Sequence, residues 1–153
     1  MAMADPIDLR EVSGCTCLRA RRLARQLTGT YDKALKPVGL TVNQFGVLAK
    51  LYGATRGSPT GLAIGALADR VGMHPTTLNR DLKPLKAQDL IADAVEGSDR
   101  RIRAVIITAK GIAKLRKAIP LWRRAQGRVE TGLGADSTRA LNELLDLAFT
   151  KLG

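Results

Sequence analysis

Aromatic residues are scarce in this sequence: they make up 3% of its 153 residues and are scattered along the chain. Proteins that bind RNA or single-stranded nucleic acid by stacking bases need several aromatic side chains close together. The sequence therefore argues against recognition by stacking, and an RNA-binding module is disfavoured.

Metal ligands and catalytic side chains are also scarce. The chain has one histidine, His74, and two cysteines, Cys15 and Cys17, so neither a closed four-ligand zinc site nor a disulfide framework can be assembled. A Ser-His-Asp arrangement would depend on His74, and the sequence has no phosphate-binding glycine loop and no paired-carboxylate motif. We expect no metal, no cofactor and no catalytic residues, and therefore no enzyme.

Long apolar runs are absent as well. The longest, from Gly61 to Ala68, is far short of the roughly 20 residues that cross a bilayer. The first ten residues lack the basic and apolar regions of an export signal. We therefore expect no membrane segment and a cytoplasmic location.

Basic charge is what the chain has in excess. Its 25 Lys and Arg outnumber 14 Asp and Glu and give a formal net charge of +11. This excess predicts a polyanionic partner, either nucleic acid or an acidic membrane surface. Since 45% of the residues are hydrophobic, the chain can form a core, and its length suits one compact domain or two small intertwined parts.

The apolar spacing predicts a mostly α protein with one short β-hairpin. The first helix carries an apolar seam from Cys17 to Leu35, with arginines on the opposite face. Pro84 and Pro120 fall inside predicted helices and should bend or interrupt them. The expected helices cover about Val12 to Leu35, Val42 to Tyr52 after the N-cap Thr41, Leu62 to Val71, Pro75 to Ala87, and Thr108 to Thr131, followed by a last helix capped by Asp136; the expected strands cover Leu90 to Val95 and Ile102 to Ile107.

Two of these helices, joined by the short turn Gly72-Met73-His74, have the spacing of a helix-turn-helix. In the second one, Leu78, Leu82 and Leu85 form a narrow stripe that should be buried. The remaining faces carry base-reading residue types, because Arg pairs with guanine, Asn with adenine, and Thr with phosphate or a thymine methyl. The hairpin that follows has arginines at its tip and is predicted to be a wing. The predicted DNA-binding residues are Pro75, Thr76, Thr77, Asn79, Arg80, Lys83, Arg100, Arg101 and Arg103.

These residues resemble the winged-helix region of the MarR family of bacterial transcriptional regulators. The wing is the most specific part, with Asp99-Arg100-Arg101 leading to Ile107-Thr108 and Gly111, where Ile107 stands in place of the usual leucine. The resemblance also includes the runs Gly72 to Leu85, Leu90-Ile91 and Leu40 to Phe45, and the long first and post-wing helices. It covers nearly the whole chain.

The resemblance implies a winged helix-turn-helix with long dimerisation helices at both ends, in one intertwined domain. Residues 1–35 and 108–153 would form the dimer, and residues 36–107 the DNA-binding region. It implies a homodimer that binds a pseudo-palindromic operator in double-stranded DNA, represses transcription, and is released by a small, often aromatic, effector. The apolar faces of the first and last helices favour a dimer independently, because one small winged-helix core cannot cover both.

Two sensing mechanisms remain open. Trp122 and Tyr31 are the candidate effector-binding residues, although packing at the dimer contact is the favoured interpretation of Trp122. In a redox-sensing alternative, Cys17 and Tyr31 resemble the reactive pair of the hydroperoxide-sensing branch, and Cys15 is a second candidate thiol. The simpler interpretation of both cysteines is packing in a dimer helix, with Cys17 at its buried seam. On a helix the two side chains would point about 200° apart, so a disulfide between them would require unwinding.

A sequence-blind, architectural DNA-binding protein is a further alternative, because the net charge alone would support it equally well. A helix that places Asn79 and Arg80 opposite a leucine stripe argues against it. Binding to backbone phosphates alone needs lysines and little geometry.

Overall fold

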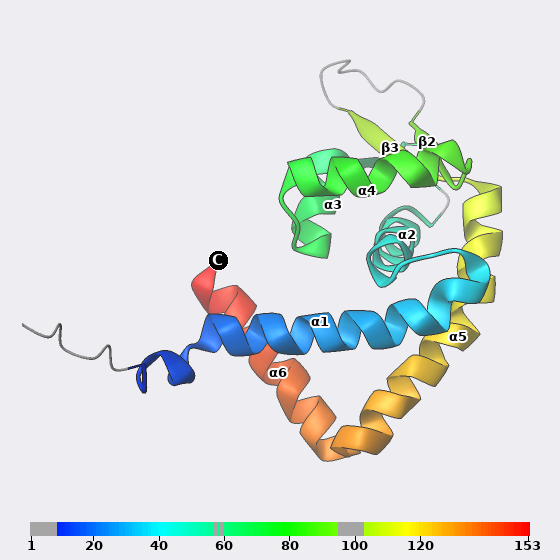
Figure 1. Ribbon diagram of the computed structural model, residues 1–153. Coiled ribbons are helices and arrows are strands. Elements are labelled where there is room, and N and C mark those ends of the chain that lie inside the picture. The colour runs from blue at the N-terminus through cyan, green and yellow to red at the C-terminus, as the bar shows by residue number, and fades with distance from the viewer. Residues whose placement is uncertain (1–8, 57, 59, 95–102) are drawn as a thin grey trace, which may run out of the picture.

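The computed structural model describes residues 9–56, 58, 60–94 and 103–153; the predicted wing residues Arg100 and Arg101 lie outside them. The described chain is mostly helical, as predicted, with a small antiparallel sheet (Figure 1). The helices are α1 (Thr16–Leu35), α2 (Val42–Thr55), α3 (Ile64–Val71), α4 (Pro75–Ala87), α5 (Ala109–Leu133) and α6 (Ala135–Leu152), and the strands are β1 (Leu62–Ala63), β2 (Ile91–Asp93) and β3 (Ala104–Ile107).

Helices α2, α3 and α4 pack with the sheet into the unit at the top of Figure 1. The strand order is β1-β3-β2, and both pairings are antiparallel, with Leu62 opposite Val105 and Ile91 opposite Ile107. The core of the unit is aliphatic, and burial of such side chains is the main force that stabilises it. Its fully buried side chains include Leu48, Leu51, Leu67, Leu78, Leu85 and Leu90.

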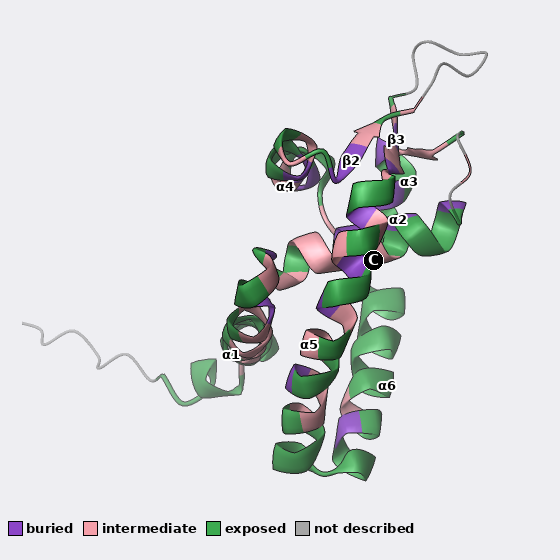
Figure 2. Cartoon of the chain, turned by 90° about the vertical axis from the view of Figure 1, so that its right-hand side faces the viewer, coloured by how far each residue is buried: buried purple, intermediate pink, exposed green. Residues whose placement is uncertain are grey.

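The other three helices form an extended arm. α5 runs from the sheet to the far end of the molecule, where α6 turns back beside it (Figures 1 and 2). α1 lies across this pair and packs mainly on α5. α6 is exposed along most of its length, and Thr138 is its single buried residue (Figure 2). Its exposed large apolar residues are Leu144, Leu145, Leu147, Phe149 and Leu152.

Side-chain caps fix the start of α2, as the sequence predicted. The hydroxyl of Thr41 accepts a hydrogen bond from the backbone N–H of Gln44, and the side-chain oxygen of Gln44 accepts one from the backbone N–H of Thr41. Asp32 of α1 also accepts a 2.6 Å hydrogen bond from the backbone N–H of Val42. Two of the amides that a helix leaves unpaired at its start are thus satisfied, and α2 continues past the predicted Tyr52 to Thr55.

The first helix begins later than predicted. A 3₁₀ turn occupies Val12–Gly14, and Cys15 has an extended backbone, so α1 starts at Thr16. Two local effects explain the difference: Gly14 has a low helix propensity, and the hydroxyl of Ser13 donates to the backbone carbonyl of Arg10 instead of supporting a helix.

The helix predicted from Leu62 also begins later, at Ile64. Leu62 and Ala63 form β1, which pairs with the distant strand β3. The backbone N–H of Ile64 donates to the carbonyl of Arg103. Local periodicity could not show this strand, because its hydrogen-bond partners lie some forty residues later in the chain.

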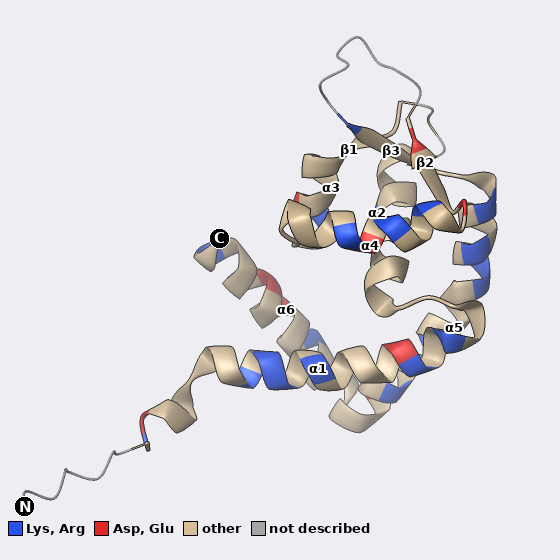
Figure 3. Cartoon of the chain, turned by 45° about the horizontal axis from the view of Figure 1, so that its top comes forward, with Lys and Arg blue, Asp and Glu red and all other residues tan. Residues whose placement is uncertain are grey.

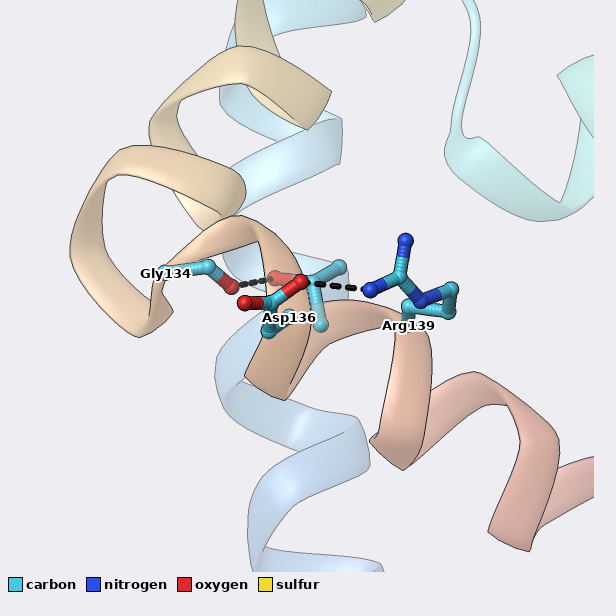
Figure 4. A network of polar contacts seen from close by, with 4 residues as sticks. Gly134, Asp136 and Arg139 are labelled. Atoms are coloured by element: carbon cyan, nitrogen blue, oxygen red, sulfur yellow. Dashed lines mark hydrogen bonds and ion pairs between the residues drawn. The ribbon is translucent and has the colours of Figure 1, made fainter.

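Asp136 was wrongly predicted as the cap of the last helix. The N-cap is Gly134, with φ of +89°, and the helix already includes Ala135. Asp136 lies in the first turn and pairs with Arg139, while the hydroxyl of Thr138 donates to the carbonyl of Gly134 (Figure 4). A positive φ of this kind is available to glycine at little cost, so the chain turns there and α6 starts two residues earlier than a cap at Asp136 would place it.

The two prolines do not end their helices. α5 is continuous through Pro120, so the predicted interruption is wrong, and α4 continues through Pro84 to Ala87. Both prolines are exposed. At an exposed position water can hydrogen-bond to the carbonyl that proline leaves without a donor.

Candidate nucleic-acid interface

α4 has one buried and one exposed face. Leu78, Leu82 and Leu85 are at most 2% exposed, as their spacing predicted. The polar residues line a shallow depression on the outer surface of α4, and Figure 3 shows its lysine and arginine positions along the helix. Of the predicted contact residues on this helix, Thr77 is half-buried and the exposed ones are Pro75, Thr76, Asn79, Arg80 and Lys83.

The turn before α4 is held by hydrogen bonds at both sides. Gly72 ends α3 with a φ of +68°, and the backbone amides of Gly72 and Met73 donate to the carbonyls of Asp69 and Ala68. This pairing of amides is a Schellman motif, which favours glycine because of the positive φ. On the other side, Nδ1 of His74 accepts from the backbone N–H of Thr76 at 3.3 Å. The orientation of α4 relative to α3 is therefore fixed by the backbone.

The base of the wing is tied to α4. An ion pair of 2.5 Å joins Lys86, in the last turn of α4, to Asp93 of β2. Of the predicted wing arginines, Arg103 is exposed beside β3, with its carbonyl bound to Ile64. The ion pair thus links the last turn of α4 to the base of the wing.

Gly111 permits the close approach of α5 to Leu90 and Ile107. A β-carbon at Gly111 would lie 2.0 Å from the carbonyl oxygen of Leu90 and 2.8 Å from Cγ1 of Ile107. Thr108 caps α5 by accepting from the N–H of Gly111, and its hydroxyl donates to the carbonyl of Asp89 at 2.6 Å. The sequence singled out Gly111 only as part of a motif, whereas the structure gives the steric reason for it.

The two candidate effector residues lie on the α1 and α5 helices and make internal contacts. The ring of Trp122 stacks on that of Phe45 with 6.0 Å between centroids, and both rings pack against the core. The hydroxyl of Tyr31 donates to Gln126, and burial together with the nearby Glu130 carboxylate raises the pKa of Tyr31. Trp122 thus packs within its own chain, whereas its predicted place at the dimer contact and the binding of an effector by either residue stay predictions.

The cysteines are arranged differently from the prediction. Cys15 precedes α1 in an extended backbone, and Cys17 is exposed in the first turn of α1 rather than at a buried seam. Ala20 and Ala24, which share the predicted seam, are also exposed, and the seam becomes buried only at Leu35. Within one chain, most of the apolar side of α1 is therefore uncovered.

Two further observations concern the described residues as a whole. No helix among them is long and apolar enough to span a membrane. Nor do their His, Cys, Asp and Glu side chains form a group of three that could hold a metal ion.

Comparison with known proteins finds relatives and solved structures that share this architecture. The crystal structure of the M. tuberculosis transcriptional regulator MosR in complex with DNA is 37% identical, covering 90% of this chain and 96% of MosR, with a TM-score of 0.76. The HTH-type transcriptional repressor Rv2887 of Mycobacterium tuberculosis is 28% identical over 125 residues, which are 82% of this chain and 86% of the repressor. A mutant MarR from E. coli complexed with operator DNA is 20% identical, covering 93% and 99% of the two chains, with a TM-score of 0.78, and supports the fold alone. No family model matches the chain.

The fold defines the chain as a winged helix-turn-helix protein with long helices at both ends. With the identity to MosR over nearly its full length, the chain belongs to the MarR family of transcriptional regulators. The family resemblance inferred from the wing and helix-turn-helix motifs is thereby confirmed. The relatives are transcriptional regulators, which are not enzymes.

Proposed function

We propose that this chain is a transcriptional repressor that binds double-stranded DNA as a homodimer, with α4 in the major groove and the wing at an adjacent minor groove. The observation that carries the proposal is the exposed face of α4, where Arg80 and Lys83 lie opposite the buried leucines and Asn79 is exposed on the flank. An α-helix fits the major groove, and side chains of these types read base edges there. The MosR and MarR structures that resemble this chain were both solved with DNA.

Each predicted contact residue has a role that its chemistry suits. Arg80 would bind O6 and N7 of a guanine, and Asn79 would bind an adenine. Pro75, Thr76, Thr77 and Lys83 would meet flanking phosphates or a thymine methyl. Arg103, with Arg100 and Arg101 of the wing, would contact the minor groove or the backbone.

The dimer follows from apolar surface that one chain leaves uncovered. Five large apolar residues of α6 are exposed, as is the N-terminal half of the seam of α1. Patches of this kind mark interfaces in soluble proteins. We assign residues 1–35 and 108–153 to dimerisation and 36–107 to DNA binding, with two half-sites about 34 to 36 Å apart.

The test is fluorescence anisotropy of the full chain on the DNA upstream of its own gene and on a scrambled duplex, across a salt series. The proposal expects tight binding to the native DNA alone, with an affinity that falls steeply as salt rises, because each neutralised phosphate releases a counterion. Equal binding to both duplexes that collapses with salt would overturn it and favour an architectural protein.

A redox-sensing repressor is the second candidate, and the position of the cysteines favours it. Because Cys15 precedes α1 with an extended backbone and Cys17 lies in the first turn, a disulfide between them would disturb only the start of the helix. In this scheme the Cys17 thiolate attacks a hydroperoxide, which leaves as an alcohol, and forms a sulfenic acid; the Cys15 thiol then displaces water to form the disulfide.

Its test compares DNA binding before and after hydroperoxide treatment of the wild-type chain, Cys17→Ser and Cys15→Ser. The scheme expects lost binding in the wild type, full retention in Cys17→Ser, and no disulfide in Cys15→Ser. Unchanged binding in the wild type, or an equal change in Cys17→Ser, would remove it.

A further inference from the structure

The tip of α6 reaches the turn of the helix-turn-helix. A β-carbon at Gly72 would lie 3.4 Å from Cε2 and 3.6 Å from Cζ of Phe149, so the ring lies against the side of Gly72 where a side chain would be. Gly72 joins α3 to α4, whereas Phe149 is near the end of the last helix. The contact therefore connects the dimerisation arm directly with the DNA-binding unit (Figure 1).

This contact spans a wide separation between the two parts of the chain. α6 packs chiefly on α5, and in Figure 1 its C-terminal end stands apart from α5, below α3. Phe149 is 66% exposed, so only one edge of the ring is used in the contact. An aromatic ring has few rotatable bonds and little conformational entropy to lose, which makes it an effective rigid spacer across such a separation.

Phe149 touches the turn at Gly72, and a displacement of this turn is passed on to α4. The Schellman hydrogen bonds at Gly72 and the cap from His74 leave the backbone between the two helices little freedom. Gly72 is three residues before Pro75, the first residue of α4. A shift of Gly72 relative to the dimerisation arm would therefore move α4 with it.

We propose that Phe149 is a positioning residue that sets the distance of α4 from the dimerisation arm, and through it the half-site spacing that the dimer accepts. The proposal rests on the proposed function, because spacing has meaning only for a dimer that binds DNA. Successive base pairs are about 3.4 Å apart along the duplex, so small displacements of the two α4 helices alter which spacing fits.

The first experiment measures the geometry without DNA. Nitroxide labels are placed at Asp69→Cys, on the exposed side of α3, in a chain that also carries Cys15→Ser and Cys17→Ser. Pulsed electron–electron double resonance then gives the distance between the two labels of a dimer. The variants are Phe149→Ala, the conservative Phe149→Tyr, and the control Thr150→Ala, at an exposed polar residue next to Phe149 in α6.

We expect a broadened or displaced distance distribution in Phe149→Ala, a wild-type distribution in Phe149→Tyr, and little change in Thr150→Ala. Sedimentation tests whether each variant is dimeric. The proposal is overturned if Phe149→Ala keeps the wild-type distribution, or if it dissociates the dimer while Thr150→Ala does not, since the ring would then belong to the contact between copies.

The second experiment measures binding, without labels, to operators whose half-site spacing is changed by one base pair in either direction. We expect the wild type to lose about tenfold in affinity when the spacing is wrong and Phe149→Ala to lose about threefold or less. An unchanged spacing preference in Phe149→Ala overturns the proposal. A wild type that binds all duplexes equally overturns the proposed function instead, and the distances between labels then still decide whether Phe149 positions α4.

Discussion

The hydroxyl of Tyr31 on α1 donates a 2.5 Å hydrogen bond to Oε1 of Gln126 on α5. Gln126 in turn donates through Nε2 to Glu130 at 2.8 Å. This chain of hydrogen bonds joins α1 to α5 within the extended arm. Burial and the Glu130 carboxylate both disfavour the phenolate, so the pKa of Tyr31 lies above its ordinary value of 10.0.

Replacing Tyr31 by Phe should lower the free energy of unfolding at pH 7 by about 1 kcal/mol, because it removes one hydrogen bond. The raised pKa means that the folded state holds the phenol proton more tightly than the unfolded state. The contribution of Tyr31 is therefore fully present below pH 10 and is lost as pH rises through the folded pKa. Urea unfolding at one protein concentration, from pH 7 to pH 11, should show the wild type and Tyr31→Phe converging above pH 10. Tyr52→Phe, at an exposed position of α2, is the control, and a difference that stays constant with pH would contradict the assignment.

Replacing Gly111 by Ala should destabilise the fold by about 2 kcal/mol or more, because the new methyl group would overlap the carbonyl of Leu90. Gly132→Ala in the same helix is the matched control. Gly132 is exposed, and a β-carbon there would meet no atom within 4 Å. This control should gain about 0.5 to 1 kcal/mol from helix propensity. Thermal and urea unfolding measure the change in stability of the two variants. Equal changes at the two glycines would contradict the argument that the overlap with Leu90 causes the loss.

Arg80→Ala and Lys83→Ala should weaken DNA binding in different ways. Loss of a bidentate guanine contact should reduce discrimination between operator and scrambled duplex by about 1 to 3 kcal/mol. Loss of a phosphate contact at Lys83 should weaken binding to both duplexes. It should also reduce the slope of log affinity against log salt concentration by about one. Anisotropy titrations across salt measure both quantities. Arg128→Ala, at the far end of α5, is the charge-matched control. If Arg80→Ala discriminates between operator and scrambled duplex as well as this control does, the role assigned to Arg80 is contradicted.

Asp89→Gly should raise the free energy of unfolding by up to about 1 kcal/mol. Asp89 has a φ of +57° between α4 and β2, a conformation that costs an L-residue energy and that glycine adopts freely. The hydrogen bond from Thr108 is made to the backbone carbonyl of Asp89 and is kept in the variant. Asp69→Gly, within α3, should instead lower stability through its helix propensity. A fall in the melting temperature of Asp89→Gly would contradict the strain argument.

The elements that local sequence determines were predicted well. α4 begins and ends where the sequence placed it, because proline at its first position, the histidine cap and the leucine stripe all act within one helix. The Thr41 cap was likewise predicted from a short-range pattern, and the helix after the wing was predicted to begin at Thr108, which is its N-cap. The exposed face of α4, and hence most of the proposed DNA contacts, follows directly from the burial of Leu78, Leu82 and Leu85.

The features that the sequence did not predict depend on contacts between distant residues. β1 exists because β3 pairs with it, and the contact of Phe149 with Gly72 depends on how α6 folds back past α1. The seam of α1 was interpreted correctly as apolar, yet its outer half has no partner within the chain. Periodicity shows that a face is apolar, but it does not show which element covers that face.

The continuity of α5 through Pro120 has a mechanical consequence. Its 25 residues follow a path of about 37 Å at 1.5 Å per residue, held close to Leu90 near one end and leading into α6 at the other. The helix changes direction along its length (Figure 1) but keeps one continuous backbone, so no loop separates its two ends. The distance between the sheet and the turn into α6 is therefore set by a single helix, and a change in its bend would move one relative to the other.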